Sequence, residues 1–320
     1  MIKQETVYEM RLVSALEKVF LDERPVYRPE CMKLTALKGE TVSFQAACTC
    51  TSFMKNRVKV RIESPISDRI HVRKVENVPA GRVCGPIVDD NYLKTESGLY
   101  PDLLRELVDG EVDIFPQKWR SIWIDIEVTE DVKAGLYPVT VILEKDGETL
   151  ARAATEVTIY DAVLPKQKMM HTEWFYLDCL ADYYHVPVFS EEHWEIITNY
   201  LKEYVKRGCN MILTPLFTPA LDTAVGIERT TTQLLDVRVE NGNYSFGFDR
   251  VKKWIDLCQS CGIEYFEICH LFSQWGAKYA PKVMAVVNGK EEQIFGWHTP
   301  AVGEYTKFLH SLLPQLTEKL

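Results

Sequence analysis

Two groups of side chains in the second half of the sequence have the types and spacing needed for chemistry. His171 and Glu173 stand two residues apart in a segment with strand-like composition, so their side chains would share one face. Such a pair could bind the polar groups of a substrate, and it could equally form a buried structural hydrogen bond. The second group, His270, Gln274 and Trp275, follows the last strand predicted below and forms a second candidate cluster.

Three further polar residues are candidates with a structural alternative. Asp178 begins the loop after the His171 segment, where it could accept hydrogen bonds from a ligand or equally cap and order that loop. Asn210 and Thr214, on the strand that follows, are weaker candidates for ligand contact.

Cys258-x-x-Cys261, with Cys269-His270 close behind, has part of the spacing of a zinc site. However, the apolar periodicity places Cys258 on the buried face of a helix, and no second C-x-x-C pair lies at finger spacing. We therefore interpret these thiols as core residues and predict no metal. Neither a phosphate-binding glycine loop nor a G-x-S-x-G elbow occurs, so we predict no cofactor.

The elements that must position these residues alternate as β-α-β-α-β-α, which indicates a parallel sheet with right-handed crossovers. The predicted strands cover 169–176, 210–216 and 263–270. The first predicted helix covers 191–207 and has Ser190 as its N-cap. The second begins at the N-cap Asp249 and ends at Gly262, and the third begins near Thr299-Pro300.

The loops that leave these strands are long, whereas the turns that enter them are very short. The long loops cover 177–189, 214–248 and 271–298, and two of them contain Asn-Gly hairpin turns, at Asn241-Gly242 and Asn288-Gly289. In a β/α barrel the loops after the strands build the active site, so this asymmetry predicts a binding face; the alternative is loop drift without function.

Aromatic residues are frequent in these loops. Flat apolar rings beside carboxylates and amides suit the C–H faces and hydroxyl edges of a sugar, although any one ring could simply be a core residue. The loop aromatics are Tyr183, Tyr184, Trp275, Tyr279 and Trp297.

Residues 1–163 are predicted to form an antiparallel β-sandwich of short strands, with Cys84–Lys118 as a long irregular loop over it. Residues 164–320 supply only the first three βα units of a (β/α)8 TIM barrel, a truncated barrel whose strands would leave both sheet edges unpaired. We therefore expect the chain to be the N-terminal portion of a longer polypeptide; the alternative is a complete small protein with three strands.

Composition excludes several classes of function. With 37 Lys and Arg against 46 Asp and Glu, the net charge is −9, which argues against sequence-independent nucleic-acid binding. No apolar run approaches the ~18 residues of a membrane span, and the N-terminus has no apolar signal region. Nine cysteines without an export signal indicate reduced thiols and a cytoplasmic location. The sequence leaves the oligomeric state open.

Several motifs together resemble one enzyme family. In the first half they are Lys38-Gly39-Glu40-Thr41-Val42-Ser43-Phe44-Gln45, Gly85-Pro86-Ile87 and Ala134-Gly135-Leu136-Tyr137-Pro138; in the second half they are His171-Thr172-Glu173-Trp174-Phe175 with Asp178, Phe272-Ser273-Gln274-Trp275-Gly276-Ala277 and Phe295-Gly296-Trp297. These segments resemble glycoside hydrolase family 123 and the wider group that carries the domain of unknown function 4091.

The resemblance implies a β-sandwich followed by a (β/α)8 barrel and an exo-acting β-N-acetylgalactosaminidase activity, with a carbohydrate as the partner. It implies hydrolysis with retention of configuration, in which the sugar's 2-acetamido oxygen attacks C1 and an adjacent Asp-Glu pair assists. The Asp orients the acetamido group, and the Glu is the general acid and base, with a pKa raised towards neutrality. Together with the motifs, the resemblance implies substrate contacts from His171, Glu173, Trp174, Asp178, His270, Gln274 and Trp275.

The family's catalytic pair follows a third barrel helix, and this chain ends within that helix. The only Asp-Glu dipeptide here, Asp22-Glu23, precedes the sandwich strands. We therefore assign no catalytic residue and predict that the 320-residue chain alone is inactive. Two alternatives remain: a noncatalytic carbohydrate-binding protein on the same scaffold, and a metal-dependent barrel that uses His171, Glu173 and His270.

Overall fold

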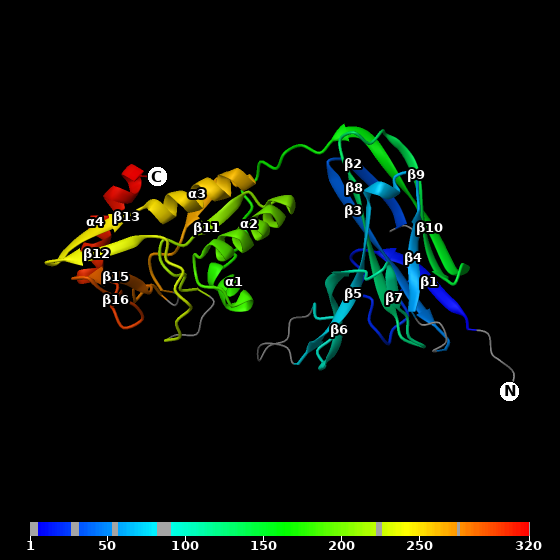
Figure 1. The fold of residues 1–320 in the computed structure, drawn as a ribbon, viewed down its shortest axis with the longest axis horizontal. Coiled ribbons are helices and arrows are strands. Elements are labelled where there is room, and N and C mark those ends of the chain that lie inside the picture. Colours follow the sequence, from blue (N-terminus) through cyan, green and yellow to red (C-terminus); the bar gives the residue numbers. More distant parts are fainter. Residues whose placement is uncertain are drawn as a thin grey trace. The chain divides into compact units, whose positions relative to one another are not determined.

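The computed structural model describes residues 6–26, 32–52, 57–81, 91–221, 226–273 and 276–319. The chain divides into two compact units, Met1–Pro165 and Lys166–Leu320 (Figure 1). Each unit has its own hydrophobic core.

The first unit is a β-sandwich of two five-stranded sheets. One sheet is antiparallel throughout and has the order β1 (Tyr8–Ser14), β3 (Glu40–Cys50), β8 (Arg120–Val128), β5 (Ile70–Ala80) and β6 (Gly98–Glu106). The other sheet has one parallel pair, the first, and the order β2 (Lys33–Lys38), β10 (Glu148–Val163), β9 (Gly135–Lys145), β4 (Arg57–Glu63) and β7 (Glu111–Asp113). A short 3₁₀ turn, Ser67–Arg69, precedes β5.

Side chains at alternate positions of facing strands form the core of the sandwich. Ile122, Ile124 and Ile126 on β8 are fully buried, as are Val139 and Val141 on β9 of the other sheet. Alternation with a period of two is the pattern of a strand with one face in the core. The same pattern in the sequence is why these strands could be predicted.

The prediction of an irregular loop over Cys84–Lys118 is wrong for its described part, because β6 and β7 lie within it. β6 pairs with β5 along its whole length, and Pro101 lies opposite Asn77 at a shift in register. A proline has no amide hydrogen to donate, but β6 is an edge strand, where a missing ladder bond is tolerated. The presence of Pro101 was therefore not a valid reason to reject a strand here. Cys84 and Pro86, at the start of the predicted loop, lie outside the described residues.

The second unit alternates helices with a parallel pair of strands, β11 and β14, as the periodicity predicts. Its main elements are α1 (Leu177–Tyr184), α2 (Glu191–Lys206), β11 (Met211–Thr214), α3 (Asp249–Cys261), β14 (Tyr265–Ile268) and α4 (Glu304–Lys319).

The ends of the helices follow the local signals in the sequence with two differences. Ser190 caps α2 as predicted, since its hydroxyl accepts the backbone N–H of His193 at 3.2 Å. Gly262 ends α3 in the left-handed conformation with φ +106°, and a Cβ there would lie 3.1 Å from Val205. Asp249, predicted to cap α3, is instead its first helical residue, and α4 begins at Glu304 rather than near Thr299-Pro300.

The predicted strand over 169–176 is absent, so the prediction of three parallel strands is wrong for the described chain. The segment runs extended beside β11, but the backbone amides of Asn210 and Met211 both donate to the His171 carbonyl. Side chains form most of the remaining links: the Asn210 carboxamide binds the His171 N–H at 2.8 Å, and the Tyr204 hydroxyl accepts the Glu173 N–H at 2.8 Å. Because side chains occupy these groups, a regular ladder does not form.

The two predicted Asn-Gly hairpins are confirmed, and they do more than predicted. They are β12–β13 (Asp236–Glu240 and Asn243–Gly247) and β15–β16 (Val283–Val287 and Lys290–Phe295). β12 also pairs in parallel with β15, so the hairpins join into one four-stranded sheet, β13-β12-β15-β16. The long loops after β11 and β14 are therefore ordered by pairing with each other.

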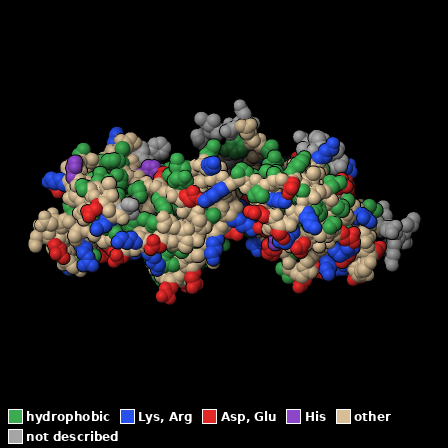
Figure 2. Space-filling model, turned by 90° about the horizontal axis from the view of Figure 1, so that it is seen from above, with side chains coloured by type: hydrophobic (Ala, Val, Ile, Leu, Met, Phe, Trp, Pro, Cys, Tyr) green, Lys and Arg blue, Asp and Glu red, His purple; other side chains and the backbone are tan. Residues whose placement is uncertain are grey.

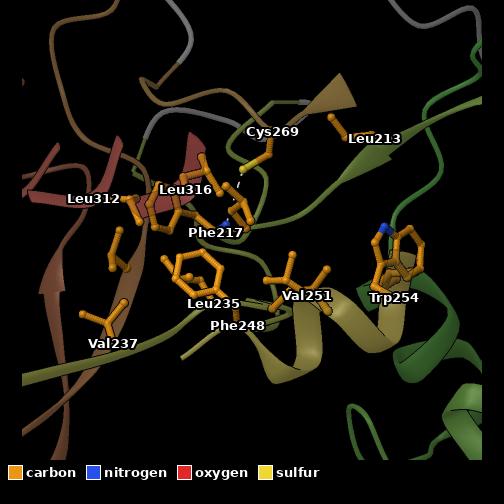
Figure 3. Close-up of a cluster of buried hydrophobic side chains, with 14 of the residues drawn as sticks. Leu213, Phe217, Leu235, Val237, Phe248, Val251, Trp254, Cys269, Leu312 and Leu316 are labelled. Carbon is orange, nitrogen blue, oxygen red and sulfur yellow. Dashed lines mark hydrogen bonds between the residues drawn. The ribbon is translucent and has the colours of Figure 1, made fainter. Parts of the chain in front are cut away.

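Helix α4 holds this sheet through a cluster of rings around Phe308. The Phe308 ring lies 5.1 Å from those of Tyr244 and Phe295, 5.6 Å from Phe246 and 5.8 Å from Phe217, measured between ring centroids. Figure 3 shows the same core continuing through Phe217, Leu235 and Phe248 to Val251 of α3.

Candidate substrate site

Glu267 of β14 faces away from helix α3. The indole N–H of Trp254 in α3 donates to the Thr214 hydroxyl on β11 at 3.3 Å, so Thr214 points towards that helix. Neighbouring residues of a strand point to opposite faces, so Leu213 points away from α3, and Glu267 is its partner in the parallel register. The carboxylate therefore projects from the sheet face that α3 leaves uncovered.

Trp174, Glu267 and His270 form a group that we name the Trp174 cluster. The indole Nε1 of Trp174 donates to Glu267 Oε2 at 2.9 Å. The His270 ring stands at 78° to the indole, with the ring centroids 5.2 Å apart. Trp174 is nevertheless 40% exposed and His270 is exposed. The cluster thus combines an accessible aromatic ring, a carboxylate and an imidazole beside the end of β14, as a polar ligand with apolar faces requires.

His171 and Glu173 also meet, as their spacing predicts. Nε2 of His171 lies 3.2 Å from Oε1 of Glu173, and 41% and 73% of the two side chains are exposed. The Cys209 thiol lies 3.9 Å from the other ring nitrogen of His171. Because the His171–Glu173 pair is exposed to solvent, it is not the buried structural hydrogen bond that was the alternative.

Asp178 lies in α1 rather than in a loop, and both of its carboxylate oxygens accept hydrogen bonds. Arg229 donates from Nε to Oδ2 at 2.6 Å and from Nη2 to Oδ1 at 3.2 Å, and only 6% of the Asp178 side chain is exposed. The guanidinium also lies 3.9 Å from the centre of the Tyr176 ring. The buried pair ties α1 to the chain before β12, which is an ordering role for Asp178.

A buried histidine joins α1 to α2. His193 accepts the Phe189 N–H at Nδ1, 2.9 Å away, and its Nε2 lies 3.0 Å from the Leu177 carbonyl. Burial lowers the pKa of His193, although the bond to the Leu177 carbonyl opposes the shift. Neutral His193 therefore fits this position, as an acceptor on one side and a donor on the other.

The remaining sequence candidates separate into two groups. Asn210 and Thr214 are buried, and the hydrogen bonds already described connect them to the backbone and to Trp254. Both are therefore scaffold residues in this structure. Gln274 and Trp275 lie outside the described residues.

Of the loop aromatics, Trp297 donates its indole N–H to the Ile227 carbonyl at 3.0 Å, which fixes one loop against another. Tyr183 and Tyr184 form a separate cluster with Tyr200 on α1 and α2. These rings join no member of the Trp174 cluster by a bond or ring contact within the part of the chain that the structure describes.

The sequence reasoning missed Glu267 and Arg229. Glu267 is an acidic residue between Phe266 and Ile268 in a predicted strand, so alternation alone places it on the face opposite to theirs. That signal was available. Arg229 had no local signal, because its partner Asp178 is distant in the sequence.

The surface and the remaining side chains limit what the site can be. Figure 2 shows acidic and basic side chains interspersed over the visible face, without a continuous basic patch. The described ranges contain no cluster of three or more His, Cys, Asp or Glu residues able to hold a metal ion, and no helix in them is long and apolar enough to cross a bilayer. The seven described cysteines are free, and burial raises the pKa of Cys269 to about 11.

Comparison with known proteins shows the family of the chain. The fold is a mixed β and α/β architecture with several antiparallel sheets. The family model of the glycoside hydrolase 123 catalytic domain matches residues 174–320, and that of the glycoside hydrolase 123 N-terminal domain matches residues 20–145. The chain belongs to glycoside hydrolase family 123.

Among solved structures, the chain is similar to a family 123 glycoside hydrolase from Clostridium perfringens, studied for glycolipid glycan hydrolysis. The TM-score is 0.69 at 17% identity, over 98% of this chain and 56% of that one, so the chain spans slightly more than half of that structure. The N-terminal domain of PorA matches 48% of the chain with a TM-score of 0.20, too low to support an argument. A comparison with curated proteins found no match.

Proposed function

We propose that the chain is the N-terminal part of a glycoside hydrolase that acts on β-linked N-acetylgalactosamine or a related amino sugar. The observation that carries the proposal is the Trp174 cluster, an aromatic ring with a carboxylate and an imidazole at the end of β14, in a chain that belongs to family 123. The Clostridium perfringens relative, a glycolipid glycan hydrolase, supports a carbohydrate substrate.

The described residues would bind the sugar rather than cleave it. The exposed indole of Trp174 offers a surface for the C–H face of a pyranose, and the His270 imidazole offers a donor and an acceptor for its hydroxyls. His171 and Glu173 stay proposed contacts on the strength of their motif, although alternation along the extended segment points their side chains to the face opposite that of Trp174. We propose an ordering role for Asp178, since Arg229 already occupies both of its oxygens. Gln274 and Trp275 remain proposed contacts on the strength of their motif.

The proposed reaction is substrate-assisted hydrolysis with retention of configuration. The 2-acetamido oxygen of the sugar attacks C1, so the usual protein nucleophile is not needed. The Asp-Glu pair that orients the acetamido group and transfers the proton does not occur in residues 164–320 of this sequence. We propose that sequence beyond residue 320 supplies it, in keeping with the fraction of the Clostridium perfringens structure that the chain spans.

We also propose that the second unit is the first part of a (β/α)8 barrel. The extended segment before α1, β11 and β14 would take the first three strand positions. The parallel β11–β14 register, the helices between these elements and the long ordered segments after each strand support this assignment. A cytoplasmic location remains a prediction from the sequence.

A comparison of two proteins tests the proposal: this 320-residue chain and the same chain extended by the sequence that follows it. We expect the extended protein to release the chromophore from an aryl β-N-acetylgalactosaminide, and the shorter chain to release none. An aryl β-galactoside, which lacks the acetamido group, should be inert. NMR of the first sugar released should show the β-anomer.

Release of chromophore by the shorter chain would refute the location of the catalytic pair. Equal cleavage of the galactoside would refute the substrate-assisted reaction. If the extended protein bound N-acetylgalactosamine but cleaved no glycoside, the noncatalytic carbohydrate-binding function would be favoured instead. The observation that favours this second function is that residues 164–320 contain no Asp-Glu dipeptide.

A further inference from the structure

One carboxylate oxygen of Glu267 accepts a hydrogen bond, and among the described residues the other has no partner. Oε2 accepts the Trp174 indole N–H at 2.9 Å, and the described part of the chain provides no hydrogen bond or ion pair for Oε1. A carboxylate has about four acceptor positions. Glu267 is only partly buried, so these positions are open to a ligand.

The geometry of the indole places the free oxygen where a bound sugar would need it. An indole N–H lies in the plane of its ring, so its acceptor lies at the edge of the ring and leaves the faces clear. A pyranose stacked on the exposed face of Trp174 directs its equatorial hydroxyls outwards, beyond the edge of that ring. A carboxylate at the edge can therefore accept a hydrogen bond from one of these hydroxyls.

We propose that Glu267 is a sugar-recognition residue with two functions: Oε2 fixes the Trp174 ring, and Oε1 accepts a hydrogen bond from a ring hydroxyl of the pyranose stacked on it. This inference rests on the proposed function, because it requires a sugar at the Trp174 cluster. Glu267 is a determinant of specificity in this scheme, since a sugar without that hydroxyl leaves a desolvated carboxylate oxygen unpaired.

The first experiment measures the indole bond without any ligand. The Nε1–H resonance of Trp174 in the 320-residue chain is identified in a ¹⁵N–¹H spectrum by its loss in Trp174→Phe. We expect Glu267→Ala to move this resonance, and Glu267→Gln to restore most of its position because an amide oxygen also accepts. Glu292→Ala, an exposed carboxylate on β16, is the matched control and should leave the resonance in place.

The second experiment measures binding by titration calorimetry, with N-acetylgalactosamine and its 3-, 4- and 6-deoxy analogues. We expect the 3-deoxy analogue, which lacks the equatorial ring hydroxyl, to bind the wild-type chain at least about tenfold more weakly than the parent sugar, as the loss of a hydrogen bond to a charged group predicts. The 4-hydroxyl is axial and the 6-hydroxyl is exocyclic, so the other two analogues are controls. In Glu267→Ala the same analogue and the parent sugar should bind about equally. If Glu267→Ala does not fold, Glu267→Gln serves, and the difference between the two sugars should still shrink.

The outcomes separate the two proposals. If the wild-type chain binds none of the sugars, the proposed sugar site and this inference both fail. If the chain binds N-acetylgalactosamine and Trp174→Ala abolishes that binding, the sugar site stands. If, in addition, removal of each hydroxyl weakens the binding of the sugar as much in Glu267→Ala as in the wild type, the role of Glu267 is refuted. An indole resonance that is unchanged in Glu267→Ala refutes the fixing of the ring.

Discussion

The buried Asp178–Arg229 pair gives a sharp test of how the segments around the candidate site are ordered. In Asp178→Asn one oxygen and most of the shape remain, but the negative charge opposite Arg229 is lost. Only 6% and 11% of the two side chains are exposed, so the pair belongs with buried ion pairs rather than with surface ones. Breaking a buried pair from one side costs about 3–5 kcal/mol, whereas surface pairs contribute about 0–1 kcal/mol.

The lower end of that range applies here. Arg229 would keep its 3.9 Å contact with the Tyr176 ring and its 3.4 Å bond to the Leu221 carbonyl. We therefore expect α1 to lose about 3 kcal/mol of free energy of local opening, which is about a hundredfold in the opening equilibrium.

Hydrogen exchange followed by mass spectrometry measures this change in the whole chain. Peptides from α1 and from 226–235 should exchange about a hundredfold faster in Asp178→Asn, while peptides from β8 and β9 of the sandwich serve as the internal control. The apolar double variant Asp178→Leu/Arg229→Met should recover part of the protection, because it leaves no unpaired buried charge. Unchanged exchange in α1 of Asp178→Asn would refute the reasoning. So would a double variant in which α1 is less protected than in Asp178→Leu or Arg229→Met alone.

Two further changes test the core of the second unit. Because burial lowers the pKa of His193, the folded state binds the proton less well than the unfolded state, so the contribution of His193 to the free energy of unfolding should be constant above about pH 6.5 and fall as the pH drops below it. Urea titrations at pH 7.5 and 5.5 should show a smaller fall in the free energy of unfolding for His193→Gln than for the wild type, and an equal fall would contradict this. Phe308→Ala removes the ring at the centre of the aromatic cluster and should lower the free energy of unfolding by about 3–5 kcal/mol, whereas Phe308→Leu should lower it by less than about 1.5 kcal/mol. Urea unfolding followed by near-ultraviolet circular dichroism measures both values, and a similar loss in the two variants would argue against a tightly packed ring.

Local signals in the sequence predicted the elements that depend on local physics. Helix α2 has apolar residues at helical spacing and a serine cap, and both hairpins have Asn-Gly turns in which the two residues adopt positive φ, such as +51° at Asn241 and +77° at Gly242. The parallel pairing of β12 with β15 was not predictable in this way. It joins two separate loops, and no residue of either hairpin specifies its partner.

The errors also have physical causes. Pro101 concealed edge strand β6, because a proline is a reason to reject a strand only where the ladder needs its amide. The segment before α1 has the composition of a strand, but the backbone N–H groups of His171 and Glu173 donate to the side chains of Asn210 and Tyr204 instead of to a neighbouring strand. The alternation of residues in the sequence does not predict such side-chain bonds. For the candidate site, the i, i+2 spacing correctly predicted that His171 and Glu173 lie together. The bond between Trp174 and Glu267 could not be predicted without knowing which strands are neighbours.

The missing ladder bears directly on the Trp174 cluster. A regular parallel ladder would position the extended segment through bonds repeated along its whole length, so that losing one bond would change little. Here the carboxamide of Asn210 binds His171 and the hydroxyl of Tyr204 binds Glu173, and Trp174 follows immediately. The indole must then reach Glu267 on β14, on the far side of β11. The position of the ring therefore depends on a few local contacts, namely the two side-chain hydrogen bonds, the backbone bonds to the His171 carbonyl and Glu267 itself, rather than on a ladder repeated along the segment.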